Sequence, residues 1–117
     1  MKPNPKQTRE KDKEYLKYIR GFNCCACWQT NSVAHHTQSI GAGGSDYKTV
    51  PLCNSCHLEG HAIGWRTFQK KYHIDFKALI VDYLHNYLTF IIKLPDKDMI
   101  ELLIAGINGY KEGESNV

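Results

Sequence analysis

Residues 24–61, CCACWQTNSVAHHTQSIGAGGSDYKTVPLCNSCHLEGH, decide how this chain folds. The stretch contains two Cys-x-x-Cys pairs, Cys24–Cys27 and Cys53–Cys56, with 25 residues between them. A structural zinc ion takes four tetrahedral thiolate or imidazole ligands, and two Cys-x-x-Cys corners commonly supply them. The spacing is slightly longer than in a typical zinc ribbon, and the Gly-rich run 41–46 can absorb the difference. We expect these four cysteines to bind one zinc ion; the alternative is a group of buried free thiols.

A fifth cysteine, Cys25, is left over. It could replace Cys24 only by forming a Cys-x-Cys corner, which is less common for zinc, so its role stays open. The N-terminus has no apolar segment of the kind found in signal peptides. Polar residues interrupt the apolar stretch 76–94, so we do not expect a membrane span. We therefore expect a cytoplasmic protein, where paired cysteines favour zinc over disulfides.

Four histidines lie within the same stretch as the cysteine pairs. His35 and His36 are adjacent, so on a strand their side chains point to opposite faces. His57 and His61 are four residues apart, so on a helix both imidazoles project from one face and can bind one divalent ion. A neutral histidine is also a common general base. Taken singly, each histidine is better interpreted as a surface or core residue than as a catalytic one, and His73 and His85 keep that interpretation.

The pattern predicts an α+β protein with a single domain over residues 1–117. Its core, residues 22–72, contains strand 32–36, a Gly-rich loop, strand 49–52 with Pro51 at a sheet edge, and a helix capped by Asn54 or Ser55. The core ends with a helix 65–72. Around the core we expect a disordered arm 1–7, a helix 8–20 capped by Thr8, and helices 76–93 and 95–105.

Helix 76–93 has an apolar stripe at helical spacing. The stripe consists of Phe76, Leu79, Ile80, Tyr83, Leu84, Tyr87, Leu88 and Ile91. Val81, Phe90 and Ile92 lie outside it, which leaves more apolar surface than one buried face needs. We therefore expect a homodimer through the 76–94 helix.

Charge is distributed unevenly along the chain, whose net charge is +3. Residues 2–20 contain seven basic and three acidic residues, whereas residues 96–117 contain two basic and five acidic ones. Further basic residues follow the predicted metal-binding helix: Arg66, Lys70, Lys71 and Lys77. A face that binds phosphate explains this distribution slightly better than a solvated helix surface does. Trp28 and Trp65 could stack on nucleic-acid bases, but core packing is the favoured interpretation for each.

Together these motifs resemble the HNH endonucleases, whose ββα-metal motif is a hairpin followed by a helix. The resemblance rests on the runs 34–36, 43–47, 49–53 and 56–61 and covers residues 23–72. It is closest to the small phage and prophage Ref-like and YbcO-like recombination nucleases. The resemblance implies a metal-dependent endonuclease that hydrolyses single- or double-stranded DNA by a single-metal mechanism, in phage DNA recombination or processing.

The resemblance also implies a role for each matching residue. His36 would be the general base, and the ligands of a catalytic ion (Mg²⁺, Mn²⁺ or another divalent ion) would be His35, His57 and His61. Lys48 stands where the family has an Asn that orients the base, and Asp46 could orient His36 in its place. Arg66, Lys70 and Lys71 would hold flanking phosphates. Lys48 favours the alternative function, a non-catalytic zinc-binding adaptor for DNA or protein with a degenerate site.

Overall fold

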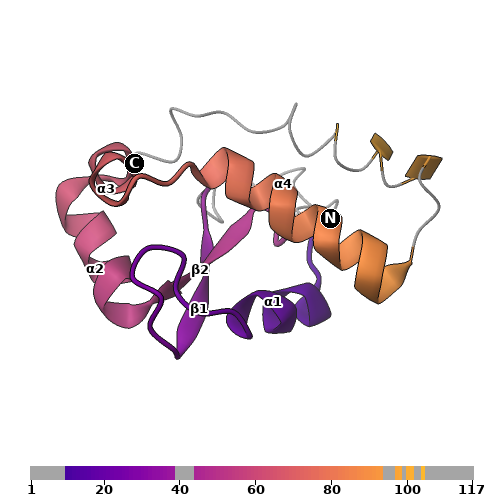
Figure 1. Ribbon diagram of the computed structural model, residues 1–117, viewed down its shortest axis with the longest axis horizontal. Coiled ribbons are helices and arrows are strands. Elements are labelled where there is room, and N and C mark those ends of the chain that lie inside the picture. Colours follow the sequence, from indigo (N-terminus) through magenta and orange to yellow (C-terminus); the bar gives the residue numbers. More distant parts are fainter. Residues whose placement is uncertain (1–9, 39–43, 94–96, 99, 102–103, 105–117) are drawn as a thin grey trace, which may run out of the picture.

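A two-stranded hairpin followed directly by a helix forms the centre of the molecule (Figure 1). The computed structural model describes residues 10–38, 44–93, 97, 98, 100, 101 and 104. Strands β1 (Ser32–His36) and β2 (Thr49–Cys53) pair antiparallel, with His35 opposite Val50 and His36 opposite Thr49. Helix α2 (Asn54–Ile63) begins at the next residue. The predicted α+β class and strand 32–36 are confirmed, and the second strand runs one residue further than predicted.

The N-cap of α2 is Cys53, and no side chain caps this helix. The predicted cap by Asn54 or Ser55 is therefore wrong. Cys53 has an extended backbone conformation, with a ψ angle of 162°, because it is still the last residue of β2. The helix starts without a capping side chain at the point where the strand ends. Its first turn places Cys56 close to Cys53.

The two faces of the hairpin are covered by different helices. On one face, Val50 and Leu52 pack against residues of α3 (Trp65–Tyr72) and α4 (Phe76–Asn86). On the other face, Ala34 packs against a second cluster, to which α1 (Lys13–Arg20) contributes Tyr15 and Ile19 and the chain around the end of α4 contributes Leu84, Tyr87 and Leu88. Figure 1 shows α2 and α3 at the left of the molecule and α1 along its lower edge, below α4. Consecutive residues of β1 therefore face two separate cores.

Helix α1 begins at Lys13, later than the predicted start at residue 8. Its N-cap is Asp12, whose carboxylate accepts a hydrogen bond from the backbone N–H of Tyr15 at 3.0 Å. The predicted cap Thr8 and the predicted arm 1–7 lie outside the described residues. At the other end of the core, Gly64 has a φ of 91°, which separates α2 from α3. The predicted helix 65–72 is confirmed.

The predicted continuous helix 76–93 changes its winding part of the way along. Helix α4 ends at Asn86, and a π-helix, η3, covers Tyr87–Ile92. Tyr87 and Leu88 are both buried there, whereas Ile91 is 57% exposed and so does not belong to the buried stripe. Most of the predicted helix 95–105 lies outside the described residues. Across the described chain, no helix has both the length and the apolar character needed to cross a lipid bilayer.

Candidate functional site

The two Cys-x-x-Cys pairs converge on one point. The Sγ atoms of Cys24, Cys27, Cys53 and Cys56 all lie within 4.8 Å of one another. The first corner is a tight loop after α1, in which Trp28 N–H donates to the Cys24 carbonyl and Cys24 N–H donates to the Gln29 carbonyl. The second corner is the junction of β2 and α2. This cluster can hold a metal ion such as zinc, as the spacing predicted.

The thiols of the cluster differ in how readily they ionise. Burial raises the pKa of Cys24, but backbone N–H groups of Cys53, Cys27 and Ala26 that donate to its sulfur bring the pKa down to about 7. Burial and the neighbouring thiols raise the pKa of Cys56. One thiolate is thus favoured and its neighbour is opposed, because several negative sulfurs cannot share a small volume. A divalent cation removes that conflict.

Cys25 does not belong to the cluster. Its side chain is buried in the core beside α4, and its backbone N–H donates to the Pro51 carbonyl at 2.9 Å. Burial, with the nearby Cys24 thiol, raises its pKa to about 12. The Cys25 side chain is therefore a protonated thiol in the core, and the backbone N–H of Cys25 connects the first corner to β2.

Three of the four histidines gather on one face of the hairpin. The ring centroid of His35 lies 5.1 Å from that of His57 and 6.2 Å from that of His61. The Nε2 atoms of His57 and His61 are 3.3 Å apart, so the helical spacing places both imidazoles together. The structure thus places the three residues expected to bind the catalytic ion next to one another, but among the described residues only the four cysteines form a group whose ligand atoms all lie within 4.8 Å of one another.

His35 is fixed in this group by packing. It is 6% exposed, and its ring lies over Trp65 with the centroids 4.1 Å apart. Burial, then the neighbouring histidines, lower its pKa to about 3, so the imidazole is neutral at physiological pH. Its Nε2 atom is buried and has no hydrogen-bond partner among the described residues. A buried, neutral, unpartnered imidazole nitrogen is the state that a metal ligand requires.

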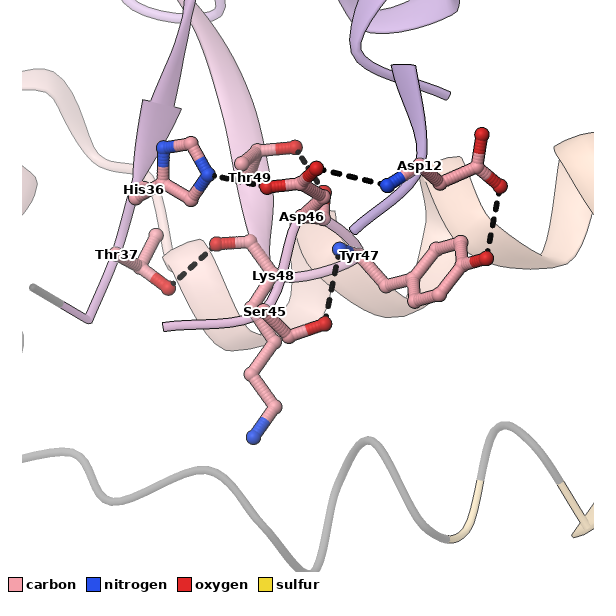
Figure 2. A network of polar contacts seen from close by, with 8 residues as sticks. All are labelled: Asp12, His36, Thr37, Ser45, Asp46, Tyr47, Lys48 and Thr49. Atoms are coloured by element: carbon pink, nitrogen blue, oxygen red, sulfur yellow. Dashed lines mark hydrogen bonds and ion pairs between the residues drawn. The ribbon is translucent and has the colours of Figure 1, made fainter. Parts of the chain in front are cut away.

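His36 lies on the opposite face of the strand, against Asp46. Its Nε2 atom is 2.8 Å from Asp46 Oδ1, and Asp46 is 2% exposed (Figure 2). The expected contact between Asp46 and the ring of His36 is therefore present. Figure 2 shows the Lys48 side chain directed away from His36, and its ammonium group lies 3.5 Å from Gln38 Oε1. Lys48 contributes its backbone carbonyl instead, which accepts from Thr37.

The basic residues after α2 fall into two groups. Arg66 and Lys70 are exposed on α3. Lys71 forms an ion pair with Glu59 of α2, which also accepts a hydrogen bond from the Tyr72 hydroxyl. Because that carboxylate already neutralises Lys71, Arg66 and Lys70 are the better placed of the three to meet a phosphate.

The two tryptophans differ in their surroundings. Trp65 is 3% exposed, which confirms core packing. Trp28 is 73% exposed, so core packing is wrong for this residue. It follows Cys27 in the tight first corner with a φ of 68°, and that left-handed turn directs the chain away from the core.

Two residues that the sequence did not single out, Asp12 and Tyr47, extend the contacts around Asp46. Asp12 donates its backbone N–H to Asp46 Oδ2 at 2.8 Å, and the Tyr47 hydroxyl donates to Asp12 Oδ2 at 2.7 Å (Figure 2). Asp12 had a signal, since an Asp before a helical run is a typical N-cap. That signal predicts the cap but not the contact with Asp46.

Comparison with known proteins gives one relative and one family. The chain is 34% identical over 61 residues to a protein named Anaredoxin from Nostoc sp., an alignment that covers 49% of this chain and 79% of that protein. No solved structure matches the chain. A family described as protein of unknown function (DUF968) matches residues 1–88, which include both cysteine corners and His35, His36, His57 and His61. The chain therefore belongs to the DUF968 family of proteins of unknown function.

Proposed function

We propose that this protein is a metal-dependent endonuclease that hydrolyses DNA phosphodiester bonds with an HNH-type, ββα-metal site. The observation that carries the proposal is that the imidazoles of His35 and His36 have different surroundings. Adjacent residues of one strand place one imidazole in a group of three and the other against a buried carboxylate. A cluster of histidines built only for packing does not require the second arrangement.

The catalytic ion would be held by His35, His57 and His61. The fit rests on the buried, unpartnered Nε2 atom of His35 and on the two Nε2 atoms of His57 and His61, which lie side by side. Three imidazoles favour a transition metal over Mg²⁺ among the ions that the sequence leaves open. When bound, such an ion supplies positive charge against the negative charge that develops at phosphate during hydrolysis.

The protein's own residues supply the base. The Asp46 carboxylate accepts from His36, so the proton of the neutral imidazole sits on Nε2 and the lone pair sits on Nδ1. Nδ1 is then the atom that takes the proton from the attacking water. Asp46 also stabilises the imidazolium that forms, since a buried carboxylate attracts the positive ring. The position of Lys48, which favoured a non-catalytic adaptor, matters less because Asp46 performs this task.

The cysteine cluster would hold a structural zinc ion. Zinc there would join the loop after α1 to the first turn of α2, because the two cysteine pairs come from these two segments. Structural zinc sites contribute on the order of 10 kcal/mol to folding. The ion would therefore stabilise the same helical turn that carries His57.

DNA would lie over the exposed side of α3, where Arg66 and Lys70 contact phosphates. A second copy of the chain would pack on the end of the last helix, where three consecutive large apolar residues, Phe90, Ile91 and Ile92, are 67%, 57% and 47% exposed. Exposed apolar surface of this kind is typical of interaction sites.

The proposal is tested by incubating supercoiled plasmid and single-stranded DNA with the protein and Mg²⁺, Mn²⁺ or Zn²⁺. We expect nicking by the wild type, and a decrease of about 10²–10⁴ in rate for His36→Ala, since that is the usual contribution of a general base. His85→Ala is the matched control, because His85 is an exposed histidine on α4. Nicking that survives His36→Ala at the wild-type rate would rule out His36 as the base.

A further inference from the structure

We propose that Asp12, the N-cap of α1, is a positioning residue for the base His36, acting through Asp46. This inference rests on the nuclease function proposed above. Asp46 has a hydrogen-bond partner on each carboxylate oxygen: Oδ1 contacts His36 Nε2 at 2.8 Å, and Oδ2 accepts the backbone N–H of Asp12 at 2.8 Å. The orientation of the Asp46 carboxylate, and with it that of the imidazole, is therefore set from two sides.

The main chain reinforces this contact. The Asp46 backbone N–H donates to the Glu10 carbonyl at 3.0 Å, and the Thr49 hydroxyl donates to the Asp46 carbonyl at 2.8 Å. Residues 10–12 thus lie against the turn that carries Asp46 rather than merely leading into a helix. Because residues 44–48 belong to no strand or helix, Asp46 depends on such contacts for a fixed orientation.

Asp12 is itself held by both of its carboxylate oxygens. Oδ1 accepts the backbone N–H of Tyr15 at 3.0 Å, and Oδ2 accepts the hydroxyl of Tyr47 at 2.7 Å (Figure 2). Burial and the contact with Asp12 raise the pKa of Tyr47, so its hydroxyl stays protonated and donates. The Tyr47 ring packs edge-on against Tyr15, with the centroids 5.2 Å apart. The side chain of Asp12 therefore anchors the segment whose backbone N–H reaches Asp46.

These hydrogen bonds form one continuous series, from Tyr47 to Asp12, from Asp12 to Asp46, and from Asp46 to His36. The positive end of the α1 dipole also favours a carboxylate at this place. Without the side chain of Asp12, the first turn of α1 loses its cap, residues 10–12 lose their anchor, and the N–H moves away from Asp46. The Asp46 carboxylate can then rotate, and the imidazole of His36 loses its fixed tautomer and direction.

The test compares Asp12→Ala with Asp75→Ala in the full-length, metal-loaded protein. Asp75 is the N-cap of α4, where its Oδ1 accepts the Lys77 N–H at 2.9 Å, so the control removes an equivalent helix cap away from His36. The first readout is the NMR signal of the hydrogen-bonded His36 Nε2–H in protein with ¹⁵N-labelled histidine. We expect it in the wild type and in Asp75→Ala, and we expect it to be lost or shifted in Asp12→Ala.

The second readout is the kinetics of DNA cleavage. In Asp12→Ala, kcat should fall about tenfold with KM unchanged, part of the contribution of about 10²–10⁴ that a positioned base makes. Asp12→Asn, which keeps the capping oxygen, should restore most of the rate. Tyr47→Phe removes a single hydroxyl from the same chain of contacts and should shift the NMR signal in the same direction, which decides the matter if Asp12→Ala does not fold.

The outcomes separate the two proposals. A wild-type His36 signal in both Asp12→Ala and Tyr47→Phe overturns the positioning role even if the protein cleaves DNA. A wild type that cleaves no DNA overturns the nuclease function, while the NMR comparison still decides whether Asp12 positions His36.

Discussion

Gly60→Ala should destabilise the protein, although alanine is the better helix former. Gly60 is buried in α2, and a Cβ atom there would lie 1.8 Å, 2.1 Å and 2.4 Å from Cζ3, Cη2 and Cε3 of Trp65. Carbon atoms pack at about 3.5–4.0 Å, so the indole would have to retreat by about 2 Å. Trp65 is 3% exposed, with Phe68 and His35 against its ring, and has no room to do so.

The two effects on the free energy of unfolding have opposite signs. Replacing a helical glycine with alanine stabilises by about 1 kcal/mol. Overpacking a core typically costs about 1–3 kcal/mol, and a clash with a confined aromatic ring belongs at or above the top of that range. We therefore expect a net loss of about 2 kcal/mol, which for a domain of this size lowers Tm by about 10 °C.

Thermal unfolding followed by far-UV circular dichroism measures the change. Gly21→Ala is the control, because Gly21 has a φ of −73° and the nearest atom to its added Cβ is the Tyr18 carbonyl oxygen at 3.3 Å. Its Tm should stay within a few degrees of wild type. A Gly60→Ala protein at least as stable as the wild type would refute the packing argument. Because Trp65 lies over His35, the same variant should also weaken ion binding at the histidines.

Three further outcomes follow from the site and the surface. Metal analysis of purified protein should find about one zinc ion per chain that is lost in Cys56→Ser and kept in His57→Ala. A second ion should be lost in His57→Ala. Loss of both ions in His57→Ala would contradict two separate sites. Arg66→Ala and Lys70→Ala should each weaken DNA binding and reduce its salt slope by about one, and an unchanged slope would exclude a phosphate contact. Light scattering at micromolar concentration should show a dimer that Ile91→Lys dissociates, and a monomeric wild type would contradict the interface.

The parts of the fold that the sequence predicted are those encoded by short spacings. A Cys-x-x-Cys pair closes a tight loop whatever follows it, and His57 and His61 share a helix face because the helix repeats every 3.6 residues. Strand 32–36 is bounded by the change from turn residues to an alternating run, so its two histidines could be assigned to opposite faces. Contacts of this kind depend on neighbours within about four residues.

The parts that were missed depend on residues far apart in the chain. Asp12 and Asp46 are 34 residues apart, and only the packing of α1 on the hairpin brings them together. Tyr87 and Leu88 are buried as the helical periodicity indicates, but the chain changes to a π-helix at Tyr87, and Ile91 of the same predicted stripe is exposed. Trp28 was assigned to the core because of its residue type, whereas the turn that closes the first cysteine corner places it outside.

The packing of Trp65 against His35 gives the molecule an intrinsic fluorescent reporter. The two tryptophans differ strongly in exposure, 3% for Trp65 and 73% for Trp28, so their fluorescence emission separates into a blue component and a red one. An ion that binds His35 changes the electronic surroundings of the blue component alone, because that ring lies 4.1 Å from the indole. Loading of the histidine site can therefore be followed by titration in the unlabelled protein, without waiting for a phosphodiester bond to break.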